Sequence, residues 1–251
     1  MNVPVIYPIN RTGALQYAVA YLTRIGCTVA QRPGPDVTHL LLGAPAFQPD
    51  GSVKGGGDLP EILEKLPPDI TVCGGNLRGH IPPSYRIADL LEDPCYLAQN
   101  ANITAHCAVR LAMDALPVTL EHCPVLVIGW GRIGKCLARL LRQMDALVTV
   151  AARKETDRAA LFSLGYDAVD STDLGYGLSR YRLIFNTVPY PVIDEEAAAF
   201  CREDCIRMDL ASEKGIAGTD VLWARGLPGK YAPESSGELI AKTLLRKGAE
   251  A

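Results

Sequence analysis

The 251-residue sequence has no long hydrophobic run, no excess of basic residues and few aromatic residues. No apolar stretch approaches the ~20 residues that a membrane-spanning helix needs, and the first residues lack the basic start and apolar core of a signal peptide. We therefore expect a cytoplasmic protein without a membrane partner. The balance of 25 Lys+Arg against 28 Asp+Glu, with 6% aromatic residues, gives no global attraction for nucleic acid and few rings for bases to stack on. Nucleic acid is therefore not an expected partner.

The eight cysteines form no recognisable metal or disulfide motif. They stand singly in apolar stretches, which favours reduced thiols over a disulfide framework. Cys201 and Cys205 are four residues apart, a spacing that predicts neighbouring positions on one face of a helix. Because neither a CxxC motif nor a nearby pair of histidines completes a set of four ligands, we expect no metal site.

What the sequence does contain is an alternation of short β-branched apolar runs with longer amphipathic segments. Such alternation is typical of βα units and predicts an α/β fold with parallel sheets. Two sets of these units occur, and we expect a smaller α/β N-terminal domain over residues 1–98. An interdomain helix and a second domain follow over 99–232, and residues 233–251 form a C-terminal helix that packs back toward the N-terminal domain.

The segment Asn102–Leu116 predicts a helix that is apolar almost all round. A helix of that kind is buried between layers, so we expect it to be a buried helix that joins the two domains. Asn102 or Thr104 is the expected cap of its N-terminus.

A glycine fingerprint is the strongest local signal. Gly129, Gly131 and Gly134 form GxGxxG between a buried strand and an amphipathic helix. The first glycine permits the tight turn, the second lets backbone N–H groups approach a pyrophosphate, and the third lets helix and strand pack closely. This context predicts a Rossmann-type doubly wound parallel sheet, with Arg132 and Ile133 also beside the cofactor. The alternative is a tight strand-to-helix turn without a ligand.

The end of the next strand carries the information on cofactor choice. An NAD site places Asp or Glu there to bind the ribose 2′-hydroxyl, whereas this chain has Arg153 and Lys154. A guanidinium offers a planar fork of donors for a 2′-phosphate, so we expect NADP to be preferred, with NAD possible. The alternative is that both side chains belong to a solvated strand end.

Two later strand ends fall where a nicotinamide lies in a doubly wound sheet. The first leads into Thr187, Val188 and Pro189, and the second into Leu210 and Ala211. We expect these residues to contact the ribose and the nicotinamide amide. Short strand ends of this composition are also ordinary turns, which is the other interpretation.

In order along the chain, the runs NANITAHCAVRLAMDA, VLVIGWGRIGKCLARLL, VTVAARK, IFNTVP, MDLAS and GLPGKYAPESSGELIA resemble the family of the dipicolinate synthase A subunit. The sequence is similar more distantly to D-2-hydroxyacid dehydrogenases. The resemblance implies a sporulation enzyme that oxidises dihydrodipicolinate to dipicolinate with NAD(P)+ as hydride acceptor. It also implies that the partner is the flavoprotein-like B subunit of dipicolinate synthase, and we expect a homo-oligomer.

For this chemistry the chain needs a base and donors for the two carboxylates of a small dicarboxylate. We expect the substrate in a cleft between the two domains. His106 is the predicted proton acceptor, because a neutral imidazole accepts protons near neutral pH. The alternative is a structural histidine inside the helix. The predicted substrate-binding residues are Asn76, Arg78, Asn100, Thr104 and Lys230, with the start of the interdomain helix assisting Asn100 and Thr104.

Two other functions stay open on the sequence. One is a regulatory subunit that binds NADP and a partner without chemistry. The other is a dehydrogenase of another small 2-hydroxy or imino acid.

Overall fold

A computed structural model describes residues 4–250, so residues 1–3 and 251 of the expected domains lie outside the described part of the chain. The chain forms two compact units. Unit 1 contains the chain up to Asn100 together with the chain from Pro228 onward, and unit 2 contains Ala101–Leu227. Both units are built on a parallel sheet with helices, so the expected α/β fold class is confirmed.

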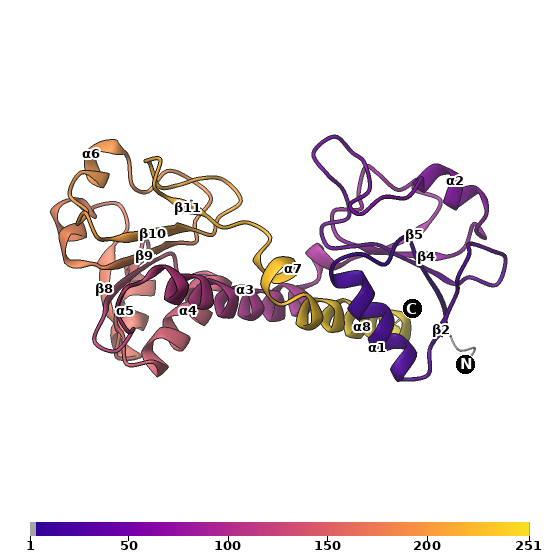
Figure 1. Ribbon diagram of the computed structural model, residues 1–251, viewed down its shortest axis with the longest axis horizontal. Coiled ribbons are helices and arrows are strands. Elements are labelled where there is room, and N and C mark those ends of the chain that lie inside the picture. The colour runs from indigo at the N-terminus through magenta and orange to yellow at the C-terminus, as the bar shows by residue number, and fades with distance from the viewer. Residues whose placement is uncertain (1–3, 251) are drawn as a thin grey trace. The chain divides into compact units, whose positions relative to one another are not determined.

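Unit 1 contains a five-stranded parallel sheet in the order β2-β1-β3-β4-β5. This is the 2-1-3-4-5 order of flavodoxin-like doubly wound folds, in which ligands bind at the carboxyl ends of the strands. The strands are β1 (Val5–Pro8), β2 (Thr28–Val29), β3 (His39–Leu41), β4 (Thr71–Gly74) and β5 (Arg86–Asp89). Helices α1 (Ala14–Arg24) and α8 (Pro233–Glu250) lie on one side of the sheet, and α2 (Leu59–Glu64) lies on the other (Figure 1).

Helices α1 and α8 come from opposite ends of the chain and pack against each other through a glycine. A Cβ atom on Gly237 of α8 would lie 2.7 Å from the backbone nitrogen of Ala18 and would also collide with the carbonyl of Ala14. Both neighbours are backbone atoms of α1, which cannot rotate away. The contact between the helices therefore depends on the absence of a side chain at residue 237.

Helix α3 (Pro94–Ala115) begins at Pro94 rather than at Asn102, so the expected caps Asn102 and Thr104 are wrong. The actual cap is Asp93, whose Oδ1 accepts a hydrogen bond of 2.7 Å from the N–H of Tyr96. Proline suits the first helical position because its missing N–H would have no partner there. The Asp-Pro pair was therefore the start signal.

The Asp93 carboxylate also ties the start of α3 to the last turns of α8. Its Oδ2 accepts from Arg246 Nη2 at 2.7 Å and lies 3.2 Å from Lys247 Nζ. Burial by itself raises the pKa of Asp93, but hydrogen bonds from Arg246, Tyr96 and Lys247 outweigh it and lower the pKa to about 2. Asp93 thus remains ionised and paired across the neutral pH range.

Helix α3 passes from unit 1 into unit 2 at residue 100, but it is not buried all round as expected. Ala105 and Ala108 have no exposed surface, whereas His106 and Arg110 are exposed and Met113 is 51% exposed. Apolar composition overstated the burial because only one side of the helix meets a core.

Unit 2 contains a six-stranded parallel sheet in the order β8-β7-β6-β9-β10-β11. Numbered within the unit, this is the 3-2-1-4-5-6 order of the Rossmann fold, as predicted. The strands are β6 (Pro124–Ile128), β7 (Leu147–Ala152), β8 (Asp167–Asp170), β9 (Leu183–Asn186), β10 (Ile206–Asp209) and β11 (Leu222–Trp223). The helices are α4 (Arg132–Gln143), α5 (Glu155–Ser163), α6 (Glu195–Ala198) and the junction helix α7 (Leu227–Tyr231). Helices α4 and α5 lie on one side of the sheet and α6 on the other (Figure 1).

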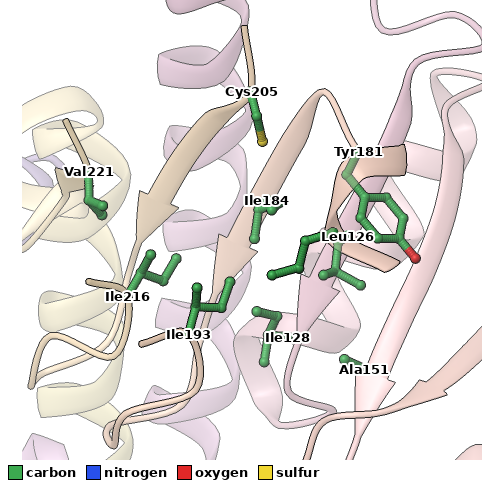
Figure 2. Packing of buried hydrophobic residues seen from close by; sticks show 10 residues of the cluster. Leu126, Ile128, Ala151, Tyr181, Ile184, Ile193, Cys205, Ile216 and Val221 are labelled. Carbon is green, nitrogen blue, oxygen red and sulfur yellow. The ribbon is translucent and has the colours of Figure 1, made fainter. Parts of the chain in front are cut away.

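The face of this sheet opposite α4 is covered by loops and short helical turns. Leu126 and Ile128 of β6 and Ile184 of β9 point into one buried cluster with Ile193 and Ile216 from the loops (Figure 2). Because alternate residues of a strand face opposite sides, Val125 and Val127 are buried on the other face. The central strands are therefore covered on both faces, as expected of a parallel sheet.

Cys201 and Cys205 do not share a helix, contrary to the sequence prediction. Helix α6 ends at Ala198, and the chain makes a turn over Arg202–Cys205 before β10 begins. Periodicity could not distinguish a helix from this turn, because both bring residues four apart close together.

No helix among the described residues has the length and apolar character needed to cross a bilayer.

We predict that Gly237→Ala destabilises the protein by about 1–3 kcal/mol, because the added methyl group forces the backbones of α1 and α8 apart. Urea unfolding followed by circular dichroism measures the change. Gly229→Ala in α7 is the matched control, since a Cβ atom there meets nothing within 4 Å. Equal stability of the two variants would contradict the close contact.

Candidate functional site

The glycine fingerprint forms a tight turn between β6 and α4. The chain leaves β6 at Ile128 and enters α4 at Arg132, and Gly129 has a φ of 104°, which side chains disfavour. A Cβ on Gly129 would lie 2.5 Å from Thr187 Oγ1 and 2.9 Å from Val188 Cγ1. The turn therefore fits directly against the segment that follows β9.

The other two glycines have different surroundings. A Cβ on Gly134 would collide with the carbonyl of Gly129, which is the close approach of helix and strand predicted for this position. A Cβ on Gly131 would meet no atom within 4 Å, and no side chain caps α4 at this residue. The N-terminus of α4, at Arg132 and Ile133, thus offers backbone N–H groups toward open space. This arrangement fits the pyrophosphate of a dinucleotide.

The segment after β9 is fixed to the end of β6. Thr187 donates both its N–H and its hydroxyl to the carbonyl of Ile128, at 3.0 and 2.9 Å. Val188 is half-buried and Pro189 is exposed. Because β6 and β9 are neighbours in the sheet, these three predicted residues lie beside the fingerprint turn at the carboxyl edge.

The sequence analysis missed the group that organises this edge, the buried carboxylate of Asp209. It has no exposed surface and accepts hydrogen bonds from the N–H groups of Ala211, Gly215 and Ile216, at 3.0, 2.6 and 3.0 Å. The side-chain amide of Asn186 donates to both of its oxygens at 3.1 Å. A carboxylate that ends a strand and is followed by a glycine-containing loop was the available signal.

Asn186 extends this network back to the segment after β9. Its Nδ2 also donates to the carbonyl of Val188, and its Oδ1 accepts from the N–H of Val188, both at 3.0 Å. A Cβ on Gly215 would lie 2.6 Å from Asn186 Nδ2, so the loop after β10 lies flush against this amide. Leu210 and Ala211, both buried, are thereby held next to Val188.

Arg153 and Lys154 lie just beyond β7, the strand next to β6 on its other side, and both are exposed. The backbone below them is fixed by Arg158, whose Nη1 donates to the carbonyls of Ala152 and Arg153 at 2.9 and 2.8 Å. Arg158 also pairs with Asp170 at 2.8 Å. Their side chains thus project from a rigid strand end.

The substrate-binding candidates Asn76 and Arg78 lie in unit 1, in the loop after β4. The Asp89 carboxylate holds this loop by accepting from the N–H groups of Asn76 and Leu77 at 3.2 and 2.7 Å. Arg78 forms a two-point ion pair with Glu92, at 2.6 and 2.9 Å. A substrate carboxylate would therefore share this guanidinium with Glu92.

The remaining candidates lie on helices. Asn100 and Thr104 are inside α3, so the amides around them serve intrahelical hydrogen bonds and no helix start assists them, contrary to the sequence prediction. Thr104 is buried and His106 is exposed, both on the unit 2 part of α3. Lys230 is exposed on α7 in unit 1.

The strand order and fingerprint turn of unit 2 place the fold among the Rossmann-type dehydrogenases. D-lactate dehydrogenase from Escherichia coli, for example, matches with a TM-score of 0.65 at 13% identity, over 98% of this chain and 97% of the other. The predicted distant likeness to D-2-hydroxyacid dehydrogenases is confirmed at the level of the fold.

The A subunit of dipicolinate synthase is the more similar protein. The curated sequence from Bacillus subtilis (strain 168) is 23% identical over 247 residues, covering 90% of this chain and 82% of the relative. The crystal structure from Bacillus halodurans matches with a TM-score of 0.87 at 21% identity, over 100% of this chain and 99% of the other. The Bacillus subtilis structure gives 0.84 at 20% identity, over 100% and 97%. No family model matches the chain. The predicted resemblance is confirmed.

We predict that Asp209→Asn destabilises unit 2 by about 2–4 kcal/mol, because an amide nitrogen would face donors that now share a carboxylate. Thermal unfolding of the full chain measures this loss. Asp173→Asn changes an exposed carboxylate of the same unit and serves as control, with an expected change within about 0.5 kcal/mol. Similar unfolding temperatures for the two variants would contradict the role of Asp209.

Proposed function

We propose that the chain is an NAD(P)-dependent oxidoreductase that resembles the A subunit of dipicolinate synthase in activity and oxidises dihydrodipicolinate to dipicolinate. The observation that carries this proposal is the fingerprint turn with open space at Gly131, in a chain similar to that dipicolinate synthase protein over 90% of its length. A role in sporulation and a position in the cytoplasm belong to the same proposal.

In this proposal the N-terminus of α4, from Gly131 to Gly134, binds the pyrophosphate of the cofactor. Gly129 allows the turn, and the network of Asp209 and Asn186 fixes the segments that contact the nicotinamide half. Those contacts come from Thr187, Val188, Pro189, Leu210 and Ala211. When bound, NADP supplies the hydride acceptor.

Arg153 and Lys154 supply the preference for NADP over NAD. They project from the end of β7 with no carboxylate at the strand end itself, and Glu155 and Asp157 first appear within α5. A 2′-phosphate at this edge gains charge-assisted hydrogen bonds from the guanidinium of Arg153. A 2′-hydroxyl gains less, so NAD is the weaker cofactor.

On the substrate side, the chain's own groups bind two carboxylates and accept one proton. His106 is exposed on α3 and can accept that proton from the ring as aromaticity is established. Arg78 is already oriented by Glu92, and the Asp89 carboxylate fixes the loop that carries Asn76. Asn100, Thr104 and Lys230 complete the proposed set, contributing side chains rather than helix amides.

The relative from Bacillus subtilis is named as one lettered subunit of a synthase, and this supports the existence of a partner protein. We propose the flavoprotein-like B subunit of dipicolinate synthase for this role, in a complex in which the present chain forms a homo-oligomer.

The choice of cofactor is tested by Arg153→Asp. We predict that this variant loses at least about tenfold in affinity for NADP, since one charge-assisted contact of about 1.5 kcal/mol or more is replaced by repulsion, with NAD nearly unaffected. Isothermal titration calorimetry with each dinucleotide measures both affinities. Arg180→Asp, which changes an exposed arginine of the same unit, should bind both as the wild type does. Equal losses for NADP and NAD in Arg153→Asp would contradict the assignment.

The reaction is tested by absorbance at 340 nm with freshly generated dihydrodipicolinate and NADP+, with and without the partner protein. We expect NADPH to form, and His106→Asn to lower kcat by about 100-fold or more, the usual contribution of a general base. His122→Asn is the matched control, because His122 sits exposed in a turn with a φ of 57°, which asparagine tolerates.

Two results would overturn parts of this proposal. NADP binding without turnover, alone and with the partner, would identify a nucleotide-binding protein without chemistry. A loss of less than about tenfold in His106→Asn would remove the proton-acceptor role.

A further inference from the structure

Cys201 and Cys205 are brought together by a closed turn at the amino end of β10. The N–H of Cys205 donates to the carbonyl of Arg202 at 3.1 Å, which closes the turn Arg202–Cys205. Before it, the N–H of Cys201 donates to the carbonyl of Ala198, also at 3.1 Å. The two cysteines therefore flank a reversal of the chain, and their thiols are joined by a side-chain hydrogen bond.

Ion pairs keep this turn rigid. Arg202 binds Asp204 through two contacts of 2.7 and 3.0 Å, and Arg182 approaches the same carboxylate at 3.2 Å. Both cysteine side chains also pack on the hydrophobic cluster beneath the sheet, where Figure 2 shows Cys205 at the start of its strand. Neither thiol has to travel far to meet the other.

The two thiols differ in access and in charge. Cys205 is buried, with 6% of its surface exposed, whereas Cys201 is partly exposed. The hydrogen bond from Cys205 lowers the pKa of Cys201, and the nearby guanidinium of Arg207 lowers it further, against burial and the carboxylate of Asp220, which pairs with Arg207. The same hydrogen bond and burial raise the pKa of Cys205. Cys201 is thus the accessible nucleophile and Cys205 the buried second thiol.

We propose that Cys201 and Cys205 form a reversible disulfide, with a low-molecular-weight disulfide such as oxidised glutathione as the oxidant. The Cys201 thiolate attacks one glutathione sulfur and releases one glutathione thiolate, which takes a proton from solvent. The Cys205 sulfur, after giving its proton to solvent, attacks Cys201 in the mixed disulfide and releases the second glutathione. Two protein thiols are oxidised, and one small disulfide is reduced to two thiols.

This proposal does not depend on the proposed enzymatic function. The pair lies at the amino end of β10, whereas the fingerprint turn and Asp209 lie at the carboxyl edge of the same sheet. Oxidation can therefore be measured on the folded chain without substrate or cofactor.

The sequence provides a direct assay, because Arg202 separates the two cysteines. Trypsin cleaves after Arg182, Arg202 and Arg207, so the cysteines fall in separate peptides, 183–202 and 203–207. The full-length folded protein is equilibrated in glutathione buffers of increasing oxidised fraction, free thiols are blocked with N-ethylmaleimide, and the digest is analysed by mass spectrometry. We expect the two peptides joined, with a mass two hydrogen atoms below their sum, and separated again by dithiothreitol.

Variants and rates identify the order of the steps. In Cys205→Ser we expect the glutathione adduct of Cys201 to accumulate, and in Cys201→Ser we expect neither adduct nor linked peptide. Cys95→Ser removes an exposed cysteine outside the pair and should leave the linked peptide unchanged. In the wild type, iodoacetamide should modify Cys201 about tenfold faster than Cys95 at neutral pH.

The outcomes separate the proposal from its alternatives. A wild type that stays reduced in oxidised glutathione, or that stops at the mixed disulfide, would overturn it. Linkage of Cys201 to another cysteine, or modification of Cys201 no faster than Cys95, would overturn the pairing and the role of Cys201.

Discussion

The carboxyl edge of unit 2 depends on one buried negative charge. The Asp209 carboxylate takes hydrogen bonds from three backbone N–H groups and from the Asn186 amide, all without contact with water. A buried charge is tolerated only when its lone pairs are satisfied, so the loop after β10 has little freedom to move while the unit is folded. Through Asn186 the same constraint reaches the segment after β9, against which the fingerprint turn fits. The proposed nicotinamide side of the site thus derives its shape from a residue that need not touch the cofactor.

The glycines add a steric constraint to this electrostatic one. Gly129 and Gly134 leave no room for a Cβ atom, because Thr187 and the carbonyl of Gly129 occupy that space. Gly131, between them, borders open space. The turn is thus closed on the protein side and open on the side where α4 begins, which is the polarity that an anion site at a helix start requires.

The parts of the fold that could be predicted from the sequence rest on local rules. Gly129, Gly131 and Gly134 act within one strand-to-helix turn, so their spacing alone carried the Rossmann prediction. Asp209 was missed because its role depends on Asn186, a residue of another strand, and no periodicity links the two. The start of α3 was misplaced because apolar pattern was weighed above the Asp93–Pro94 pair. Cys201 and Cys205 were assigned to a helix because spacing cannot distinguish one helical turn from a closed loop. The roles of His106, Arg78 and Lys230 stay predictions, since they depend on a bound substrate.

The pairing of α1 with α8 has a consequence for the order of events during synthesis. Unit 1 is completed by residues that follow unit 2 in the chain, whereas unit 2 is continuous. As the polypeptide leaves the ribosome, α1 emerges long before the helix that covers it, and the smaller sheet must wait with an apolar surface uncovered. Unit 2 has all its strands available before α8 has been made. The first hundred residues are therefore the part of the nascent chain that most needs protection from aggregation.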